Sequence, residues 1–258
     1  MFRVYMIIGI ACVILLSCFA CGKGEALVVF AAAGLEDAFT ELQLMAEKAC
    51  GRSITYTFAG AGVLCRQLKD GVVADVFISS SVYYMDRLAE DVAIAQDSRI
   101  AILENTLAVI GQPGSAHVFG REALRDLLDA VPKFAMGDPK LASVGRYAEN
   151  VLRRLELTRS TNERILLGDS SIQVARYVET GAVPYGFVYG SDARLSGDHG
   201  KSSPVYQFSN AELSEEPIIY MAAVLENAPR KSSARKFVEF LRSEEAGHVF
   251  ISEGFSIP

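Results

Sequence analysis

The sequence predicts an α/β fold of two lobes, each with a mostly parallel sheet flanked by helices. Short runs rich in β-branched and aromatic residues alternate with amphipathic runs of helical period, which is typical of βα units. The chain has 258 residues and is half hydrophobic, which suffices for two lobes. Two strand-like runs, around Leu107 and Tyr220, flank a middle part that reads as a complete unit.

The N-terminus differs from the rest of the chain and predicts a signal peptide at 1–20. Arg3 supplies a positive charge, and the apolar run after it is too short for a membrane span. A small residue precedes Cys21 and polar residues follow it, as in bacterial lipoprotein processing sites. We therefore expect lipidation of Cys21 and a tether at 21–25. Cys18 fits such a site too, and an ordinary secretory peptide is the alternative.

The first lobe is predicted from residues 26–104 and 226–258. Its first strand, at 27–30, ends in small residues that lead through Gly34 into a helix. A second strand ends in the same manner, before a helix that begins near Ala61. The elements expected in this lobe, after that first strand and its helix, are strands at 54–58 and 74–79 and helices from 63, at 82–89, 233–241 and 244–251.

The second lobe is predicted from residues 105–225, with the chain crossing between the lobes near residues 105 and 220. A strand at 105–111 is followed by a strong loop signal, Gln112-Pro113-Gly114. The further elements expected here are helices at 123–128, from 143 and at 172–179, and strands at 134–137, 185–190 and 220–225.

Four turns share one pattern, in which small uncharged residues precede a helix. They lie at Gly34, Ala61, Val144 and Ser171. Helix N-termini present unpaired N–H groups and a partial positive charge, so such turns suit an anion. Taken singly, each can equally be an ordinary strand-to-helix turn. If the four meet between the lobes, they form an anion site made of backbone donors.

Two further residues bear on this site. Tyr189 ends its strand and can add a phenolic donor, although a tyrosine there can also face solvent or the hinge. Arg146 lies just inside the helix after Val144, and we expect it to face solvent.

Composition excludes several classes of function. The net charge is −6 and no run of Lys or Arg forms a patch, so no nucleic-acid partner is expected. No nucleophile–base motif and no zinc-type spacing is present, so we expect neither an enzyme nor a resident metal or cofactor. Cys50 and Cys65 are expected to be unpaired buried thiols, with a disulfide as the alternative.

Taken together, short motifs in order along the mature chain resemble those of the molybdate-binding proteins of bacterial ABC importers. The resemblance implies the two-lobed type II periplasmic binding protein fold, with two crossings between lobes. The motifs are VFAAAGL (29–35), FAGAG (58–62), ADVFIS (74–79), GDP (137–139), GRYA (145–148), GFVYGSD (186–192) and GF (254–255).

The resemblance also implies a site. That family holds a tetrahedral dianion through two serines of the first lobe, two backbone amides of the second and a tyrosine. By position, the serines fall on Gly34 and Ala61. The amides fall on Val144 and Ser171, and the tyrosine on Tyr189. Both serine hydroxyls are thus replaced in this chain, although the hydroxyl of Ser171 can return one.

The expected ligand is therefore molybdate or tungstate, whose Mo or W is the only metal expected. A different anion or small solute, or a structural lipoprotein that has lost its ligand, is the alternative. The resemblance further implies a monomer in the periplasm or at the cell surface, anchored to the membrane by its lipid. Its expected partners are the membrane subunits of an ABC importer.

Overall fold

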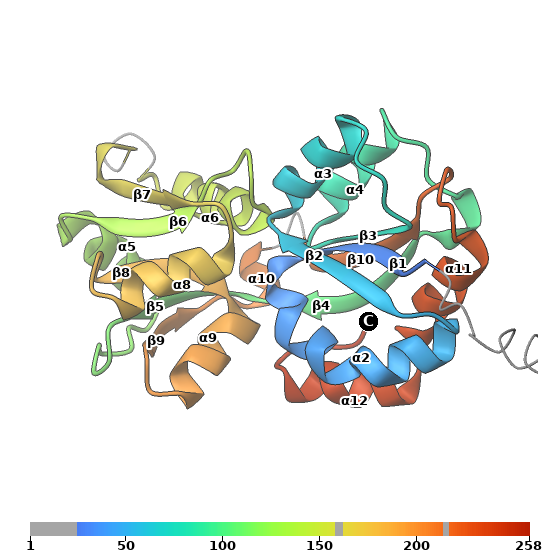
Figure 1. Cartoon of the computed structure of the whole chain (residues 1–258). Helices are drawn as coiled ribbons and strands as arrows, with labels where there is room; N and C mark the ends of the chain where they lie inside the picture. The colour runs from blue at the N-terminus through green and yellow to red at the C-terminus, as the bar shows by residue number, and fades with distance from the viewer. Residues whose placement is uncertain (1–24, 158–161, 214–216) are drawn as a thin grey trace, which may run out of the picture.

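The computed structural model describes residues 25–157, 162–213 and 217–258 and shows two α/β lobes side by side (Figure 1). The predicted signal peptide and Cys21 lie outside the described residues. Within the described ranges, no helix has the length and apolar character needed to cross a membrane. Cys50 and Cys65 are buried free thiols, as expected.

The first lobe is built on a sheet with the strand order β2-β1-β3-β10-β4 in the described part of the chain. β1 pairs in parallel with β2 and β3, so the carboxyl ends of these three strands share one edge of the sheet. That edge faces the second lobe. The strands are β1 (Leu27–Ala32), β2 (Ile54–Ala59), β3 (Val76–Ser79), β4 (Ile100–Asn105) and β10 (Ile218–Val224).

Helices cover both faces of this sheet (Figure 1). α3 (Ala61–Lys69) and α4 (Val82–Ala89) lie on one face, and α2 (Glu36–Cys50), α11 (Lys231–Phe240) and α12 (Glu244–Ser252) lie on the other. Phe39 of α2 is fully buried and packs against Phe237 and Phe250, with ring centres 6.0 Å apart in both pairs. This aromatic cluster joins the start of the chain to its end.

The second lobe repeats the plan, with the strand order β7-β6-β8-β5-β9. α5 (Arg121–Ala130) and α6 (Ser143–Arg154) lie on one face, and α8 (Ser171–Glu179) and α9 (Gly190–Asp198) lie on the other. The strands are β5 (Leu107–Gly111), β6 (Phe134–Gly137), β7 (Ile165–Gly168), β8 (Tyr185–Tyr189) and β9 (Ser203–Gln207). The short helical segments are η1 (Ala33–Leu35) and η2 (Gln96–Ser98) in the first lobe, and η3 (Asn162–Arg164) and α10 (Asn210–Leu213) in the second.

The two-lobed α/β fold is confirmed, but both sheets are mixed. β10 runs antiparallel to β3 and β4, and β5 runs antiparallel to β8 and β9. The reason is the crossing, because a strand that leaves or returns to a lobe enters the sheet without a βα connection that would make it parallel.

The position of β10 also corrects the predicted lobe boundaries. The chain leaves the first lobe between β4 and β5, at Asn105 and Thr106. It has already returned at Ile218, because β10 lies between β3 and β4 in the first sheet. Residues 218–224 therefore belong to the first lobe, and the predicted second lobe of 105–225 extends too far. Alternation of residues identifies a strand, but the sheet to which the strand belongs is decided by its partners.

Candidate ligand-binding site

A small cavity lies between the two lobes, with a volume of about 20 Å³. That space exceeds what one water molecule needs and is far smaller than the ~300–1,000 Å³ of a typical organic ligand pocket. Among the described residues, none with a charged side chain lines it. The lining consists of Ala32, Ala33, Gly34, Ala59, Gly60, Ala61, Ser80, Ala142, Ser143, Val144, Ser170, Ser171 and Tyr189.

Helices from both lobes begin at this cavity. α3 begins at Ala61, α6 begins at Ser143 and α8 begins at Ser171, while η1 leads through Gly34 into α2. Neither α3 nor α6 has a side chain that caps its N-terminus, whereas the Ser170 hydroxyl accepts a hydrogen bond from the Gln173 N–H in α8. Uncapped first turns leave backbone N–H groups for a ligand.

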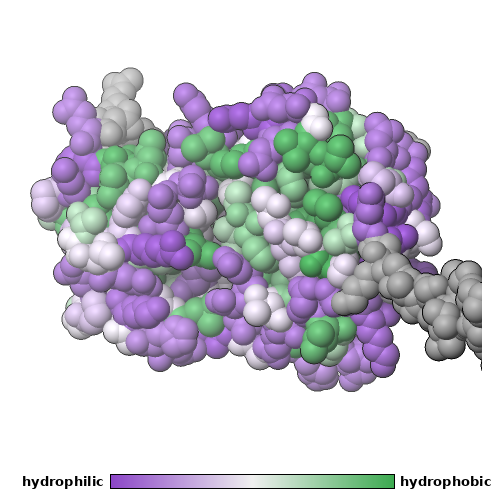
Figure 2. Space-filling view, in the orientation of Figure 1, coloured by the Kyte–Doolittle hydropathy of each residue, from purple (hydrophilic) through white to green (hydrophobic). Residues whose placement is uncertain are grey.

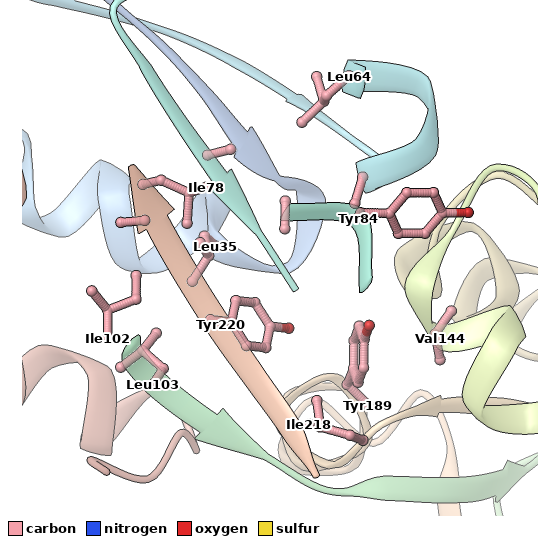
Figure 3. Close-up of a cluster of buried hydrophobic side chains, with 14 of the residues drawn as sticks. Leu35, Leu64, Ile78, Tyr84, Ile102, Leu103, Val144, Tyr189, Ile218 and Tyr220 are labelled. Atoms are coloured by element: carbon pink, nitrogen blue, oxygen red, sulfur yellow. The ribbon is translucent and has the colours of Figure 1, made fainter. Parts of the chain in front are cut away.

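The five residues predicted from the sequence all line this cavity. Gly34 and Ala61 come from the first lobe, and Val144, Ser171 and Tyr189 come from the second. Figure 3 shows Tyr189 between Val144 and Tyr220, a tyrosine of the opposite lobe. The structure therefore brings together the four turns and the strand-end tyrosine.

Two hydroxyl groups at the cavity escaped the sequence reasoning, those of Ser80 and Ser143. Burial raises the pKa of Tyr189 well above its ordinary value, and the nearby Ser80 and Ser143 hydroxyls partly offset this. Within the described structure, the Tyr189 phenol oxygen is buried and has no well-formed hydrogen bond. An unsatisfied buried phenol is costly unless a ligand pairs with it. The signal for Ser80 was present in the run of serines that closes β3.

The hydroxyl of Ser171 lines the cavity and also has a partner inside the protein. It accepts a hydrogen bond from the Tyr189 N–H at 2.9 Å, which leaves its own proton for another acceptor. Burial raises the pKa of Asp192 to about 6, although the nearby Ser171 hydroxyl lowers it. Asp192 therefore is a buried acid at the edge of the site, and a Cβ atom on Gly34 would lie 3.4 Å from its Oδ1.

The two lobes are closed on each other around the cavity. The Gly62 N–H donates to the Leu141 carbonyl at 2.9 Å, and the Tyr84 phenol donates to the Pro139 carbonyl at 2.8 Å. Figure 3 shows Tyr84 reaching from the first lobe toward the second. At Gly60 the approach is so close that a Cβ atom would lie 2.5 Å from the Leu141 carbonyl oxygen.

Arg146 does not simply face solvent, as the sequence suggested. Its guanidinium lies 3.4 Å from the ring centre of Tyr83, which belongs to α4 of the opposite lobe. Its Nε is buried without a hydrogen-bond partner in the part of the chain that the structure describes. Helical spacing placed Arg146 on the polar face of α6, but it did not show that this face meets the other lobe.

Two mixed α/β lobes that meet over a small uncharged cavity are typical of a solute-binding protein. The comparison with protein families agrees. Residues 27–256 match the model of the bacterial extracellular solute-binding proteins, and the chain belongs to this family. The family is a class of transport proteins, not of enzymes. Across the described residues, no group of His, Cys, Asp and Glu is arranged to hold a metal ion.

Individual relatives are similar over nearly the whole chain. YvgL of Bacillus subtilis, which carries the provisional name of an ABC transporter substrate-binding lipoprotein, is 30% identical over 236 residues, or 91% of this chain and 87% of YvgL. The molybdate-binding protein ModA of Haemophilus influenzae is 28% identical, with 92% of each chain covered. The periplasmic molybdate-binding protein of Azotobacter vinelandii has the same fold, with a TM-score of 0.75 at 21% identity over 90% of this chain and 99% of that protein.

Proposed function

We propose that this protein captures a tetrahedral oxyanion, molybdate or tungstate, between its lobes and delivers it to the membrane subunits of an ABC importer. The observation that carries the proposal is the cavity itself, which is small, lies between the lobes and is lined by helix N-termini and hydroxyl groups. A cavity of about 20 Å³ leaves no space for a sugar or a peptide and suits a compact ion.

The charge of the ligand follows from the kind of donor at the site. Each helix N-terminus carries a partial positive charge of roughly half an elementary charge. The hydroxyls of Ser80 and Tyr189 are able to donate as well, and the Ser143 hydroxyl can donate to a ligand in place of the Ser81 hydroxyl, its partner at 3.1 Å. Asp192, at the edge of the site, opposes a negative ligand when it is ionised, and burial raises its pKa to about 6.

The hydroxyls of Ser80 and Ser143 can also compensate for the two family serines that this chain lacks. Ser80 comes from the first lobe, next to the positions of Gly34 and Ala61, and Ser143 comes from the second. We infer that they take over part of the hydrogen bonding that serines at 34 and 61 provide elsewhere. Hydrogen bonds to a charged group contribute about 1.5–3 kcal/mol each, so this compensation preserves a useful affinity.

Names of relatives support the same ligand and the same partner. ModA of Haemophilus influenzae is a molybdate-binding protein, and YvgL is named for an ABC transporter. We propose for this chain a monomer with no resident cofactor, in the periplasm or at the cell surface. We also propose that Cys21 carries a lipid that anchors it to the membrane, in keeping with the lipoprotein name of YvgL.

Thermal unfolding with and without millimolar molybdate, tungstate, sulfate or phosphate tests the proposal. A ligand that binds only the folded state raises the free energy of unfolding by mass action, by about 2.7 kcal/mol at a ligand concentration one hundred times Kd. The Tm rises as a result. We expect molybdate and tungstate to raise the Tm most. If none of the four anions raises it, the protein does not bind a tetrahedral oxyanion.

Tyr189→Phe tests whether the ligand sits in this cavity. The variant removes the buried phenol oxygen and is expected to weaken binding by about 1.5–3 kcal/mol in a calorimetric titration. Tyr177→Phe is the matched control, because Tyr177 lies on α8 away from the lining of the cavity. Equal effects of the two variants would place the ligand elsewhere.

A further inference from the structure

Two grooves flank the cavity at the boundary between the lobes, and their charges are opposite. The first, called the cationic groove, has a volume of about 550 Å³ and runs between α3 and α4 of one lobe and the start of α6 of the other. Among the described residues that line it, Glu149 is the only carboxylate. Its cations are Arg66, Lys69, Arg87, Lys140 and Arg146.

The second, called the acidic groove, has a volume of about 430 Å³ and lies between the start of α2 and helices α8 and α9. It is lined by four carboxylates and by Arg176, His199 and Lys201, and it shares Ala33 and Gly34 with the lining of the cavity. The carboxylates are those of Glu36, Asp37, Glu179 and Asp192. An anion that approached the cavity from this side would pass these groups.

Cations in the cationic groove are only partly neutralised. Lys69 pairs with Asp91 and Arg87 pairs with Glu90. Arg66, Lys140 and Arg146, by contrast, form no ion pair with any residue that the structure describes. These three side chains come from both lobes, Arg66 from the first and Lys140 and Arg146 from the second, so each side of the opening between the lobes carries cations without an ion pair.

The hinge also distinguishes the two grooves. The Gly190 N–H donates to the Thr106 carbonyl at 2.8 Å and the Asn105 amide donates to Ser191 at 2.9 Å, so the acidic groove at Asp192 lies beside the crossing. The cationic groove is bridged by non-covalent contacts such as that of Tyr84 with Pro139. The hydrogen bond from the Gly62 N–H to the Leu141 carbonyl lies between this groove and the cavity, so the two communicate only when such contacts break and the lobes open.

We propose that the cationic groove is the entrance through which the oxyanion reaches the cavity, and that Arg66 and Lys140 draw it in. The inference rests on the proposed function. The whole chain has a net charge of −6, so an approaching anion is repelled by the molecule at large and needs a local positive region. Clefts lined by one sign of charge raise association rates by about 10- to 1,000-fold.

The structure separates capture from retention. The cavity holds its ligand with dipoles, and the cations of the groove do not line it. Charges at the rim of a site act mainly on the association rate and on its salt dependence, whereas groups inside the site act on the dissociation rate. Removal of the groove charges should therefore slow association and leave the dissociation rate nearly unchanged.

Stopped-flow measurement of tyrosine fluorescence with molybdate tests the proposal, because the chain has 10 tyrosines and no tryptophan. The test variant is Arg66→Glu with Lys140→Glu. The matched control is Arg176→Glu with Lys201→Glu, which changes the net charge equally but on the acidic groove. Each protein is measured at low salt, near 10 mM, and at high salt, near 1 M, where charges are screened beyond roughly 3 Å.

We expect the test variant to associate about tenfold more slowly than wild type at low salt and at nearly the wild-type rate at high salt. The control is expected to change association less than about twofold. Equal slowing in both variants would make net charge the cause and would overturn the entrance. Absence of any molybdate response in wild type would instead overturn the proposed function, and the entrance with it.

Discussion

The guanidinium of Arg146 lies 3.4 Å from the ring centre of Tyr83, and the two residues belong to opposite lobes. Burial raises the pKa of the neighbouring Tyr84 to about 12, although the positive charge of Arg146 lowers it. A cation over an aromatic face contributes about 0.5–2 kcal/mol. Because this contact exists only when the lobes are closed, its free energy favours the closed state.

Arg146→Met is expected to weaken molybdate binding by about 0.5–2 kcal/mol, because it keeps the aliphatic stem and loses the charge over the ring. Tyr83→Leu should weaken it similarly. Calorimetric titration of both single variants and of the double variant gives the coupling. If the two effects add fully, the two side chains do not act through each other.

Gly60→Ala is expected to weaken binding by about 1–3 kcal/mol while the free protein keeps its stability. The added Cβ would meet backbone oxygens of the other lobe, that of Leu141 at 2.5 Å, so it obstructs closure. Its backbone φ of −61° is ordinary for alanine, so the first lobe itself is not strained. Titration and thermal unfolding of the free variant measure the two quantities.

Gly197→Ala is the control for Gly60→Ala. It lies in α9, where no atom lies within 4 Å of an added Cβ. This variant should bind like wild type and gain about 0.5–1 kcal/mol of stability, because alanine loses less conformational entropy in a helix. Wild-type affinity in Gly60→Ala would mean that the bound lobes do not approach as closely as they do here.

Ala61→Ser and Gly34→Ser should differ, although the family comparison treats the two positions alike. Serine at 61 adds a donor at the cavity and is expected to tighten molybdate binding by about 1.5–3 kcal/mol. A serine hydroxyl at 34 would have the Asp192 carboxylate beside it, because the Cβ would lie 3.4 Å from Oδ1. Gly34→Ser should therefore tighten binding less. A larger gain at 34 than at 61 in calorimetric titration would contradict this geometry.

Asp192→Asn is expected to stabilise the free protein at neutral pH and not below about pH 4. Burial raises the pKa of Asp192 from 3.8 to about 6, so between these values the folded state binds more protons than the unfolded state. Stability of the wild type therefore falls as the pH rises through this window, by up to roughly 3 kcal/mol. Asparagine removes that dependence.

Denaturant unfolding of both proteins across this pH range measures the effect. Asp198→Asn is the control, because Asp198 is an exposed carboxylate on the same helix. A constant difference between wild type and Asp192→Asn from acid to neutral pH would show that the carboxyl keeps an ordinary pKa in the folded protein.

Cys21→Ser should abolish incorporation of a labelled fatty acid in cells that produce the full chain. The expectation rests on the cysteine that follows the apolar run and on the polar tether after it. Unchanged labelling of the variant would move the anchor to Cys18. A wild-type protein that takes up no label would be secreted without an anchor.

Interior strands of the two described sheets were predictable from the sequence, and so was the edge strand β2, whereas the other three edge strands were not. β6 was expected at 134–137 and lies there, because four consecutive buried residues leave a clear apolar run. The strands that were missed, β4, β7 and β9, all lie at the edge of a sheet. β7 is a short apolar run that is only partly buried, and β9 contains Pro204, which argues against a strand.

The site divides in the same way. The four turns and the strand-end Tyr189 were predictable, because each depends on a local signal in the sequence. Ser80, Asp192 and the contact of Arg146 were not, because their roles exist only where the two lobes meet. A chain pattern contains no information on which surface of one lobe will approach the other.

The place of β10 in the first sheet has a consequence for how the chain folds. Residues 80–217 separate β3 from β10, yet these two strands are neighbours. The second lobe draws its sheet from one continuous stretch, β5 to β9, and can complete it as soon as that stretch has been synthesised. The first lobe must hold a gap between β3 and β4 until the last part of the chain arrives, and such long-range closure is slow. Formation of the first sheet therefore ends with β10, and that strand carries Tyr220 to the edge of the cavity.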